Sequence, residues 1–239
     1  MKTALISGGA ARIGAQIVRT LHENGYKVII HCHQSEEIAQ ALCRELNSKR
    51  NSSAQVVVAD LGDNEAIKKL TQTIKSLDLL VNNASVFYPT STENSTIEDW
   101  DKIININLRA PFFITTGLSK VLATSQGSIV NIIDIHSDRP LKNHSIYNIS
   151  KAGLKMLTKT LAKELAPNIR VNGVSPGSIL WPQDLAELSE EEKLNMLERI
   201  ALKKQGSTED IAEAVLFLAD AKYITGEVIN IDGGRSLNQ

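Results

Sequence analysis

Residues 7–14 read SGGAARIG, a glycine-rich turn that follows the apolar run 3–6 and precedes a helical pattern. A turn of this kind between a first strand and a first helix is typical of a dinucleotide-binding site. Such turns usually carry three glycines, the middle one letting the backbone approach a pyrophosphate. Gly8 and Gly14 fit the outer two positions, and Arg12 stands where the middle glycine is expected. The stretch predicts a nucleotide-binding α/β fold and raises the question of what the arginine does.

Outward from this turn, strand-like and helical segments alternate along the whole chain. This alternation predicts one domain, 1–239, with a Rossmann-type, doubly wound parallel sheet of about seven strands and helices on both faces. We expect strands at 3–7, 27–31, 55–58, 77–81, 128–133, 169–174 and 228–231, and helices near 12–24, 35–48, 63–76, 98–122, 145–166 and 208–219.

The composition is that of an ordinary globular protein. Hydrophobic residues make up 42% of the 239 residues, charged residues make up 22%, and the net charge is −1. This balance gives no electrostatic reason to expect a nucleic acid or an anionic membrane as a partner. We find no apolar run of membrane-spanning length and no signal-peptide core at the N-terminus. Cys32 and Cys43 lack metal-ligand spacing, so we expect idle or buried thiols in a cytoplasmic protein.

One long stretch, 178–205, breaks the alternation. It follows the strand expected at 169–174 and contains the acidic helical pattern 184–199. Open α/β sheets bind ligands beyond the carboxyl ends of their strands, so we interpret the stretch as a substrate loop with a lid helix. A solvated surface insertion is the alternative.

Tyr147 and Lys151 are spaced to share one face of a helix that follows the strand at 129–133. A lysine ammonium beside a tyrosine favours the phenolate, so we expect the pKa of Tyr147 to be lowered toward the working pH, as suits a general acid. The alternative is a surface tyrosine beside a solvated lysine.

The order of further motifs points to one family. The matching motifs are the loop at 7–14, Asp60, the NNA at 82–84, Asn107, the Tyr147 and Lys151 pair, and the Pro-Gly at 176–177. With these motifs the chain resembles the short-chain dehydrogenase/reductase family over nearly its whole length. The resemblance implies that Tyr147 donates a proton, that Lys151 binds the nicotinamide ribose, and that Asn107 supports Lys151 through a water. The cofactor contacts expected in addition come from Gly8, Arg12, Ile13, Gly14, His33, Gln34, Ser35, Asp60, Leu61, Asn83, Ala84, Ser85, Pro176, Gly177 and Ser178.

Two positions depart from the general family. Asp134 stands where the family has a serine that binds a substrate carbonyl, and an ionised carboxylate there would repel the charge that develops during carbonyl reduction. A carboxylate suits a C=N bond, whose nitrogen must receive a proton; a simple cap of the strand end is the alternative. Phe87, in a segment where the family has glycine, offers a face to a flat ring, or else fills a packing gap.

These departures, together with the arginine in the loop, resemble the pteridine reductase branch. The resemblance implies NADPH-dependent reduction of dihydropterins, and possible action on dihydrofolate. It implies a homotetramer with 98–122 and 145–166 at one interface, and a C-terminal segment, 233–237, that reaches a neighbouring subunit's active site. The substrate contacts that it implies come from Arg12, Ser85, Phe87, Asp134, Tyr147, Leu180 and Trp181.

The end of the second strand bears on the cofactor. No acid precedes Glu36 there, which permits the 2′-phosphate of NADPH, and His33, Gln34 and Ser35 can donate hydrogen bonds. Gln34 stands where the branch often has an arginine, so one strong charged contact is lost. A metal pair of His31 and His33 is an alternative that lacks a third ligand. For the whole chain, a carbonyl reductase of the same fold and a non-catalytic nucleotide-binding protein are the rival hypotheses.

Overall fold

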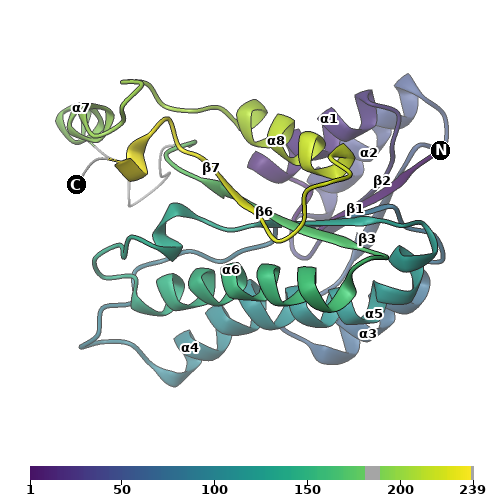
Figure 1. The fold of residues 1–239 in the computed structure, drawn as a ribbon, viewed down its shortest axis with the longest axis horizontal. Helices are drawn as coiled ribbons and strands as arrows, with labels where there is room; N and C mark the ends of the chain where they lie inside the picture. Colours follow the sequence, from purple (N-terminus) through teal and green to yellow (C-terminus); the bar gives the residue numbers. More distant parts are fainter. Residues whose placement is uncertain (181–188, 238–239) are drawn as a thin grey trace.

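The computed structural model describes residues 1–180 and 189–237, and it confirms the predicted fold class (Figure 1). Seven parallel strands form one sheet in the order β3-β2-β1-β4-β5-β6-β7. The strands are β1 (Thr3–Ile6), β2 (Lys27–Cys32), β3 (Ala54–Val58), β4 (Leu79–Asn82), β5 (Ser128–Ile132), β6 (Arg170–Pro176) and β7 (Val228–Ile231).

Helices cover both faces of the sheet (Figure 1). One face carries α1 (Arg12–Glu23), α2 (Glu36–Lys49) and α8 (Thr208–Asp220). The other carries α3 (Asn64–Thr73), α4 (Ile97–Ile104), α5 (Ala110–Thr124) and α6 (Ser145–Leu165). The short helix α7 (Glu190–Glu198) lies apart, at the end of the molecule where the chain also ends (Figure 1).

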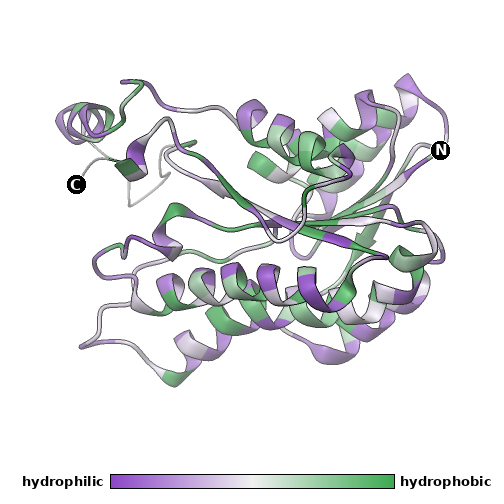
Figure 2. Cartoon of the chain, in the orientation of Figure 1, coloured by the Kyte–Doolittle hydropathy of each residue, from purple (hydrophilic) through white to green (hydrophobic). Residues whose placement is uncertain are grey.

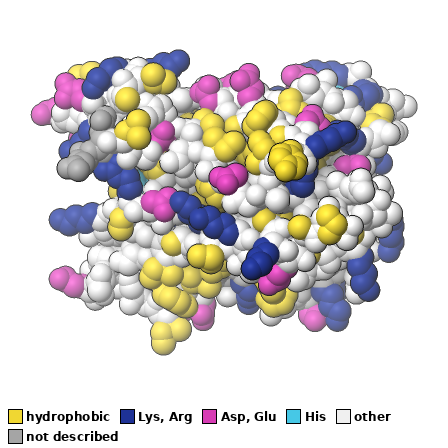
Figure 3. All heavy atoms as spheres, viewed as in Figure 1, with side chains coloured by type: hydrophobic (Ala, Val, Ile, Leu, Met, Phe, Trp, Pro, Cys, Tyr) yellow, Lys and Arg dark blue, Asp and Glu magenta, His cyan; other side chains and the backbone are white. Residues whose placement is uncertain are grey.

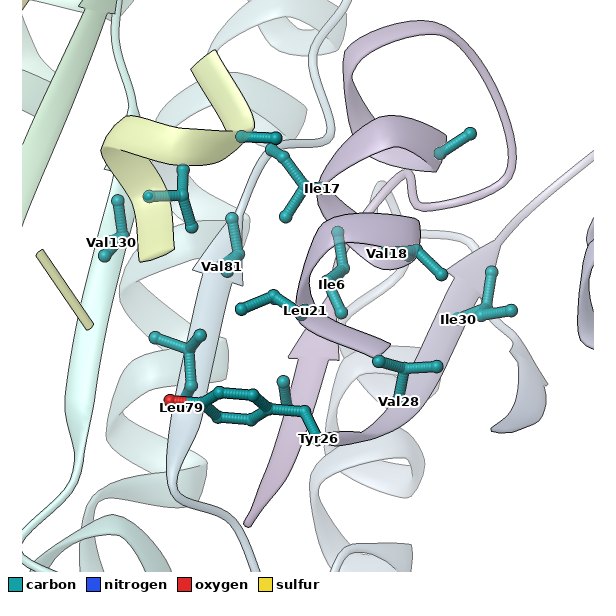
Figure 4. Packing of buried hydrophobic residues seen from close by; sticks show 14 of the residues in the cluster. Ile6, Ile17, Val18, Leu21, Tyr26, Val28, Ile30, Leu79, Val81 and Val130 are labelled. Carbon is teal, nitrogen blue, oxygen red and sulfur yellow. The ribbon is translucent and has the colours of Figure 1, made fainter. Parts of the chain in front are cut away.

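Each helix layer buries an apolar stripe against the sheet (Figure 2). Ile17 and Leu21 of α1 are fully buried and pack in one cluster with Ile6 and Val81 of the central strands (Figure 4). Burying a side chain of this size contributes about 2 kcal/mol of hydrophobic free energy. The apolar repeat of the helix therefore fixes which face of α1 meets the sheet.

Local side-chain and glycine signals mark where helices end and begin. Asn24 is the C-cap of α1, and Gly25 follows with a φ of +85°, which favours glycine. Asp63 caps α3 by accepting a hydrogen bond from the backbone N–H of Glu65.

The prediction of one continuous helix at 98–122 is wrong in one respect, because the helix is interrupted. A π-helical turn, η1 (Asn105–Arg109), separates α4 from α5. Asn107 lies in this turn with 1% of its surface exposed, and its amide makes hydrogen bonds to other segments. The wider π turn gives that amide a place inside the molecule, and such turns are frequent at functional sites.

The strand order places the site. β1 and β4 are neighbours, so the chain leaves β1 toward one side of the sheet and returns beside it to build the other. Ligands of open parallel sheets bind in the crevice beyond the carboxyl ends of the strands at such a reversal. Among the described residues, no helix is long and apolar enough to span a membrane.

Candidate active site

The turn between β1 and α1 is packed so closely that glycine is required in it. A Cβ on Gly14 would lie 2.1 Å from the carbonyl oxygen of Gly8 and 2.7 Å from Nδ2 of Asn83. Gly8 has a φ of +62°, and a Cβ there would lie 3.0 Å from the Cα of Ala84. The turn is therefore pressed against the segment that follows β4, as the predicted site requires.

Hydrogen bonds fix this contact. The hydroxyl oxygen of Ser7 accepts from the backbone N–H groups of Asn83 and Ala84 at 2.9 and 3.0 Å. Nδ2 of Asn83 donates to the carbonyl oxygens of Ser7 and Gly8 at 2.9 and 3.0 Å. Asn83 thus holds two strand ends together, a structural role that the sequence did not reveal.

His31 secures the turn from the other side. Its Nδ1 accepts from the backbone N–H of Gly8 at 3.1 Å, which leaves the proton on Nε2, 3.1 Å from the carbonyl oxygen of Ala59. Burial lowers the pKa of His31 to about 4, so the ring is neutral near pH 7. Both ring nitrogens are engaged, and His33 lies exposed beyond the end of β2, so the two histidines do not share a metal-binding face.

Arg12 adopts the backbone of the glycine that it replaces. Its φ is +53°, in the left-handed region, which costs a non-glycine residue about 1 kcal/mol or more. The residue is exposed at the start of α1. The loop keeps the conformation of a glycine-rich turn while it carries a cation.

The residues of this edge fit a nicotinamide dinucleotide. The N-terminus of α1 has no side-chain cap and no acidic residue in its first turn, so its N–H groups are available to a pyrophosphate. At the end of β2, His33, Gln34 and Ser35 offer donors, and Nδ1 of His33 lies 3.9 Å from Oδ1 of Asp60. Among the expected contacts, Leu61 is buried in the core, at 4% exposure, and Gly14 and Pro176 are buried as well.

Asp134, Tyr147 and Lys151 come together as predicted. The hydroxyl of Tyr147 donates to Oδ2 of Asp134 at 2.8 Å, and Oδ1 of Asp134 accepts from the backbone N–H of His136 at 2.8 Å. Tyr147 and Lys151 are 5% and 3% exposed. Lys151 extends below the tyrosine ring, with Nζ 5.6 Å from the ring centroid and 3.0 Å from the carbonyl oxygen of Ile132.

The expected lowering of the pKa of Tyr147 is wrong for the chain by itself. Burial raises that pKa well above its usual value, and the carboxylate of Asp134 raises it further. Burial also lowers the pKa of Lys151 to about 8, against the attraction of Asp134. The phenol is therefore held protonated at neutral pH, with its proton directed at Asp134.

Asn107 anchors the segment after β4 instead of contacting Lys151 directly. Its Oδ1 accepts from the backbone N–H of Val86 at 2.8 Å and from the hydroxyl of Ser85 at 3.2 Å. Its Nδ2 donates to the carbonyl oxygen of Val86 and to the hydroxyl of Ser150, at 3.0 and 3.1 Å. Ser150 precedes Lys151, so Asn107 links the two chain segments of the site.

Phe87 stands beside Tyr147. The two rings meet edge to face, with centroids 4.8 Å apart, and Phe87 is 53% exposed. Its other neighbour is the ring of His144, stacked in parallel at 4.7 Å. The exposed part of Phe87 is an aromatic surface next to the phenol.

The segment after β6 completes the edge. The backbone N–H of Gly177 donates to the carbonyl oxygen of Ile231 at 2.9 Å, and a Cβ on Gly177 would lie 2.6 Å from that of Asp232. Ser178 accepts a hydrogen bond from Arg235, and Leu180 is 40% exposed. Trp181 lies outside the described residues, so its predicted substrate contact stays a prediction.

Sequence reasoning missed Ser7, His31, His144 and Arg235. Each acts through partners that are distant along the chain or, for His144, through a ring that only the fold brings near. His31 had one usable signal, a histidine near the end of an otherwise apolar strand. The others sit in loops, where no periodic pattern marks a side chain as part of a site.

A family model described as enoyl-(acyl carrier protein) reductase matches residues 8–236. The chain belongs to the short-chain dehydrogenase/reductase family. Members of this family are oxidoreductases that use nicotinamide cofactors.

Within the family, two kinds of relative match at similar levels. The chain is 33% identical to pteridine reductase 1 of Leishmania tarentolae, over 99% of this chain and 96% of that protein. It is 38% identical to the 3-oxoacyl-(acyl-carrier-protein) reductase FabG of Aquifex aeolicus, over 98% of this chain and 96% of that protein. The FabG of Staphylococcus aureus strain N315 is 37% identical, over 98% of this chain. The family and the oxidoreductase class are thus fixed, and overall identity does not separate the two substrate classes.

Proposed function

We propose that this chain reduces dihydropterins, and with lower efficiency dihydrofolate, to their tetrahydro forms with NADPH. The observation that carries the proposal is the 2.8 Å hydrogen bond from Tyr147 to Asp134. A carboxylate in this place disfavours an oxyanion, because like charges repel in a site of low dielectric. It favours a substrate whose nitrogen gains a proton.

The chemistry adds one hydride and one proton across a C=N bond. The reduced nicotinamide supplies the hydride to the ring carbon when it is bound. Tyr147 passes its proton to the neighbouring ring nitrogen, and Asp134 holds the phenol in place and relays the replacement proton. The buried ammonium of Lys151 stabilises the phenolate left behind, so the pair returns to its starting state once a proton arrives from solvent.

The remaining side chains bind and orient. The exposed ring of Phe87 would stack on the flat pterin, and the hydroxyl of Ser85 and the guanidinium of Arg12 would contact pterin and cofactor phosphates. Asn107 positions Ser85 and Val86 and reaches Ser150 next to Lys151. The other cofactor contacts are those expected from the sequence, with Leu61 acting from within the core. The stretch 178–205 would close over the pterin, and Trp181 would line its side chain.

NADPH is the expected cofactor because no carboxylate replaces the donors at the end of β2. Asp60 is the acid closest to His33 there, and Oδ1 of Asp60 already accepts from the backbone N–H of Gly62 at 2.7 Å. A preference for NADPH over NADH in steady-state assays is expected from this arrangement.

The test is the oxidation of NADPH with dihydrobiopterin, dihydromonapterin and dihydrofolate as substrates. Replacing Asp134 with serine removes the carboxylate that holds the Tyr147 hydroxyl and relays the replacement proton, and we expect pterin turnover to fall at least 100-fold. Asp138→Ser is the matched control, because Asp138 is exposed in the same turn and binds Lys155 instead. Near-normal turnover by Asp134→Ser would refute the relay, and no turnover of any pterin by the unaltered protein would refute the substrate class.

Reduction of 3-oxoacyl thioesters is the second candidate, and the identity to the FabG proteins favours it. The same two variants separate the candidates. If the unaltered protein reduces acetoacetyl-CoA faster than any pterin, and Asp134→Ser speeds that reaction further, the chain is a carbonyl reductase.

A further inference from the structure

Two arginines lie beside the Asp134–Tyr147 pair and take no part in the proposed chemistry. Arg139 follows the short turn η2 (Ile135–Ser137) that begins directly after Asp134, and its backbone N–H donates to the carbonyl oxygen of Ile135 at 3.2 Å. Arg235 belongs to the turn η4 (Arg235–Leu237) that follows β7. They come from the carboxyl ends of β5 and β7, on either side of β6.

The two arginines are built into one unit. A guanidinium nitrogen of Arg139 donates to the carbonyl oxygen of Arg235 at 3.0 Å, and the guanidinium of Arg235 donates to the hydroxyl of Ser178 at the end of β6. Asp232 holds the turn by accepting from the backbone N–H groups of Gly234 and Ser236, at 2.9 and 2.7 Å. Arg139 and Arg235 are therefore positioned by the fold, at intermediate exposure.

Charges of both signs surround this unit. Burial lowers the pKa of Arg235, the nearby cations Arg199 and Arg139 lower it too, and Asp134 and Asp232 raise it. Both carboxylates are already committed, Asp134 to Tyr147 and His136, and Asp232 to its own turn. Within 1–180 and 189–237, no carboxylate oxygen lies within 4.0 Å of Arg139 or Arg235. Figure 3 shows basic and acidic side chains together at this end of the molecule, near α7.

We propose that Arg139 and Arg235 form a subsite for an anionic group, a carboxylate or a phosphate, on the side chain of the substrate. A guanidinium binds either anion through charge-assisted hydrogen bonds, and a partly buried position strengthens them. The proposal rests on the proposed function in one respect, because the reacting ring must bind at Asp134 and Tyr147. The two arginines would raise kcat/KM for an acid-bearing dihydropterin above the value that the same site would give without them.

The decisive quantity is the ratio of kcat/KM for a charged substrate to kcat/KM for an uncharged one. Dihydrofolate supplies carboxylates, dihydroneopterin monophosphate supplies a phosphate, and dihydrobiopterin carries neither. We expect Arg235→Leu to lower the ratio at least tenfold and Arg235→Lys to lower it less than threefold. Arg44→Leu, at an exposed position on α2, is the matched control and leaves the ratio unchanged. The ratio also falls as salt rises, because salt screens partly exposed charges.

The ratio distinguishes a subsite from a merely structural arginine. Loss of cofactor binding or of folding lowers kcat/KM for both substrates alike and leaves their ratio unchanged. An unchanged ratio in Arg235→Leu therefore overturns the proposal. Whether dihydrofolate or the monophosphate shows the larger drop identifies the anion. If the unaltered protein reduces no pterin, the proposed function fails, and the same variants are compared with acetoacetyl-CoA and uncharged ethyl acetoacetate. An unchanged ratio there overturns the subsite as well.

Discussion

His31 illustrates how one buried side chain ties the nucleotide-binding turn to the rest of the sheet. Its ring bridges Gly8 and Ala59 with a single tautomer, and the residue is 2% exposed. Protonation of Nδ1 would set a donor against the N–H of Gly8 and leave a buried charge. The turn keeps its form only while this ring is neutral.

This predicts that acid weakens the fold through His31. The pKa of His31 is about 4 in the folded chain and about 6.5 in the unfolded one. Between these two pH values the unfolded chain therefore binds more protons at this residue. The free energy of unfolding has its full value above about pH 6.5. It falls by about 2 to 3 kcal/mol as the pH falls toward 4. Urea unfolding at pH 7 and pH 4.5 measures it. His31→Gln should remove that part of the pH dependence and exposed His33→Gln should keep it; equal pH dependence in all three proteins would contradict the assignment.

Tyr147 marks what the sequence could and could not predict at this scale. The i, i+4 spacing correctly placed Tyr147 and Lys151 on one helix face, and the strand end correctly placed Asp134 near them. The pKa of the phenol was predicted with the wrong sign, because burial and the carboxylate outweigh the lysine. Burial depends on every element around the ring, which spacing along one helix does not contain.

At the scale of an element, the π turn η1 supports the site through one amide. Asn107→Ala would leave the backbone N–H and carbonyl oxygen of Val86 without this partner, while the hydroxyl of Ser150 keeps its hydrogen bond to the carbonyl oxygen of Tyr147. An unsatisfied buried polar group costs about 1–3 kcal/mol. We therefore expect Asn107→Ala to lower the free energy of unfolding by at least 2 kcal/mol and to lower kcat/KM.

Asn105→Ala is the control for that prediction. Asn105 belongs to the same turn but is only partly buried. Denaturant unfolding and steady-state kinetics are compared for both variants. If Asn105→Ala is as damaging as Asn107→Ala, loss of the π turn itself and not of the Asn107 contacts is responsible.

Most elements were predictable, and the π turn was not. Apolar runs placed all seven strands within about two residues, because buried parallel strands read as nearly continuous hydrophobic stretches. The apolar repeat of 98–122 continues across η1, so periodicity alone predicts one helix there. The interruption depends on partners after β4 and in α6, which lie far away in the sequence.

At the scale of the whole molecule, the helices on one face of the sheet leave large apolar side chains in solvent. Phe113, Ile149 and Met156 are 48%, 49% and 63% exposed, on α5 and α6. Yellow side chains are visible on this lower side in Figure 3. Apolar exposure of this kind is typical of an interface, so this face is where we expect the contacts of the homotetramer, which stays a prediction.

Charge on this face should therefore break the assembly. Glutamate at Ile149 and at Met156 would have to be desolvated between subunits, so we expect the double variant to dissociate to smaller species. Ile38→Glu is the control, since Ile38 is 54% exposed on α2 across the sheet. Light scattering after size exclusion measures the mass. A protein that is monomeric before any substitution would refute the interface.

Arg12 has a consequence for how such proteins diverge. Its backbone already has the left-handed conformation that a glycine adopts freely, so exchanging the two residues requires no refolding of the turn. The left-handed strain that an arginine accepts there exceeds what the less flexible unfolded chain returns, so glycine is the more stable residue at this position. Selection on the ligand would therefore keep the arginine against a stability cost of about 1 kcal/mol. A single codon change would suffice to move a descendant between a bare nucleotide loop and one that carries a cation.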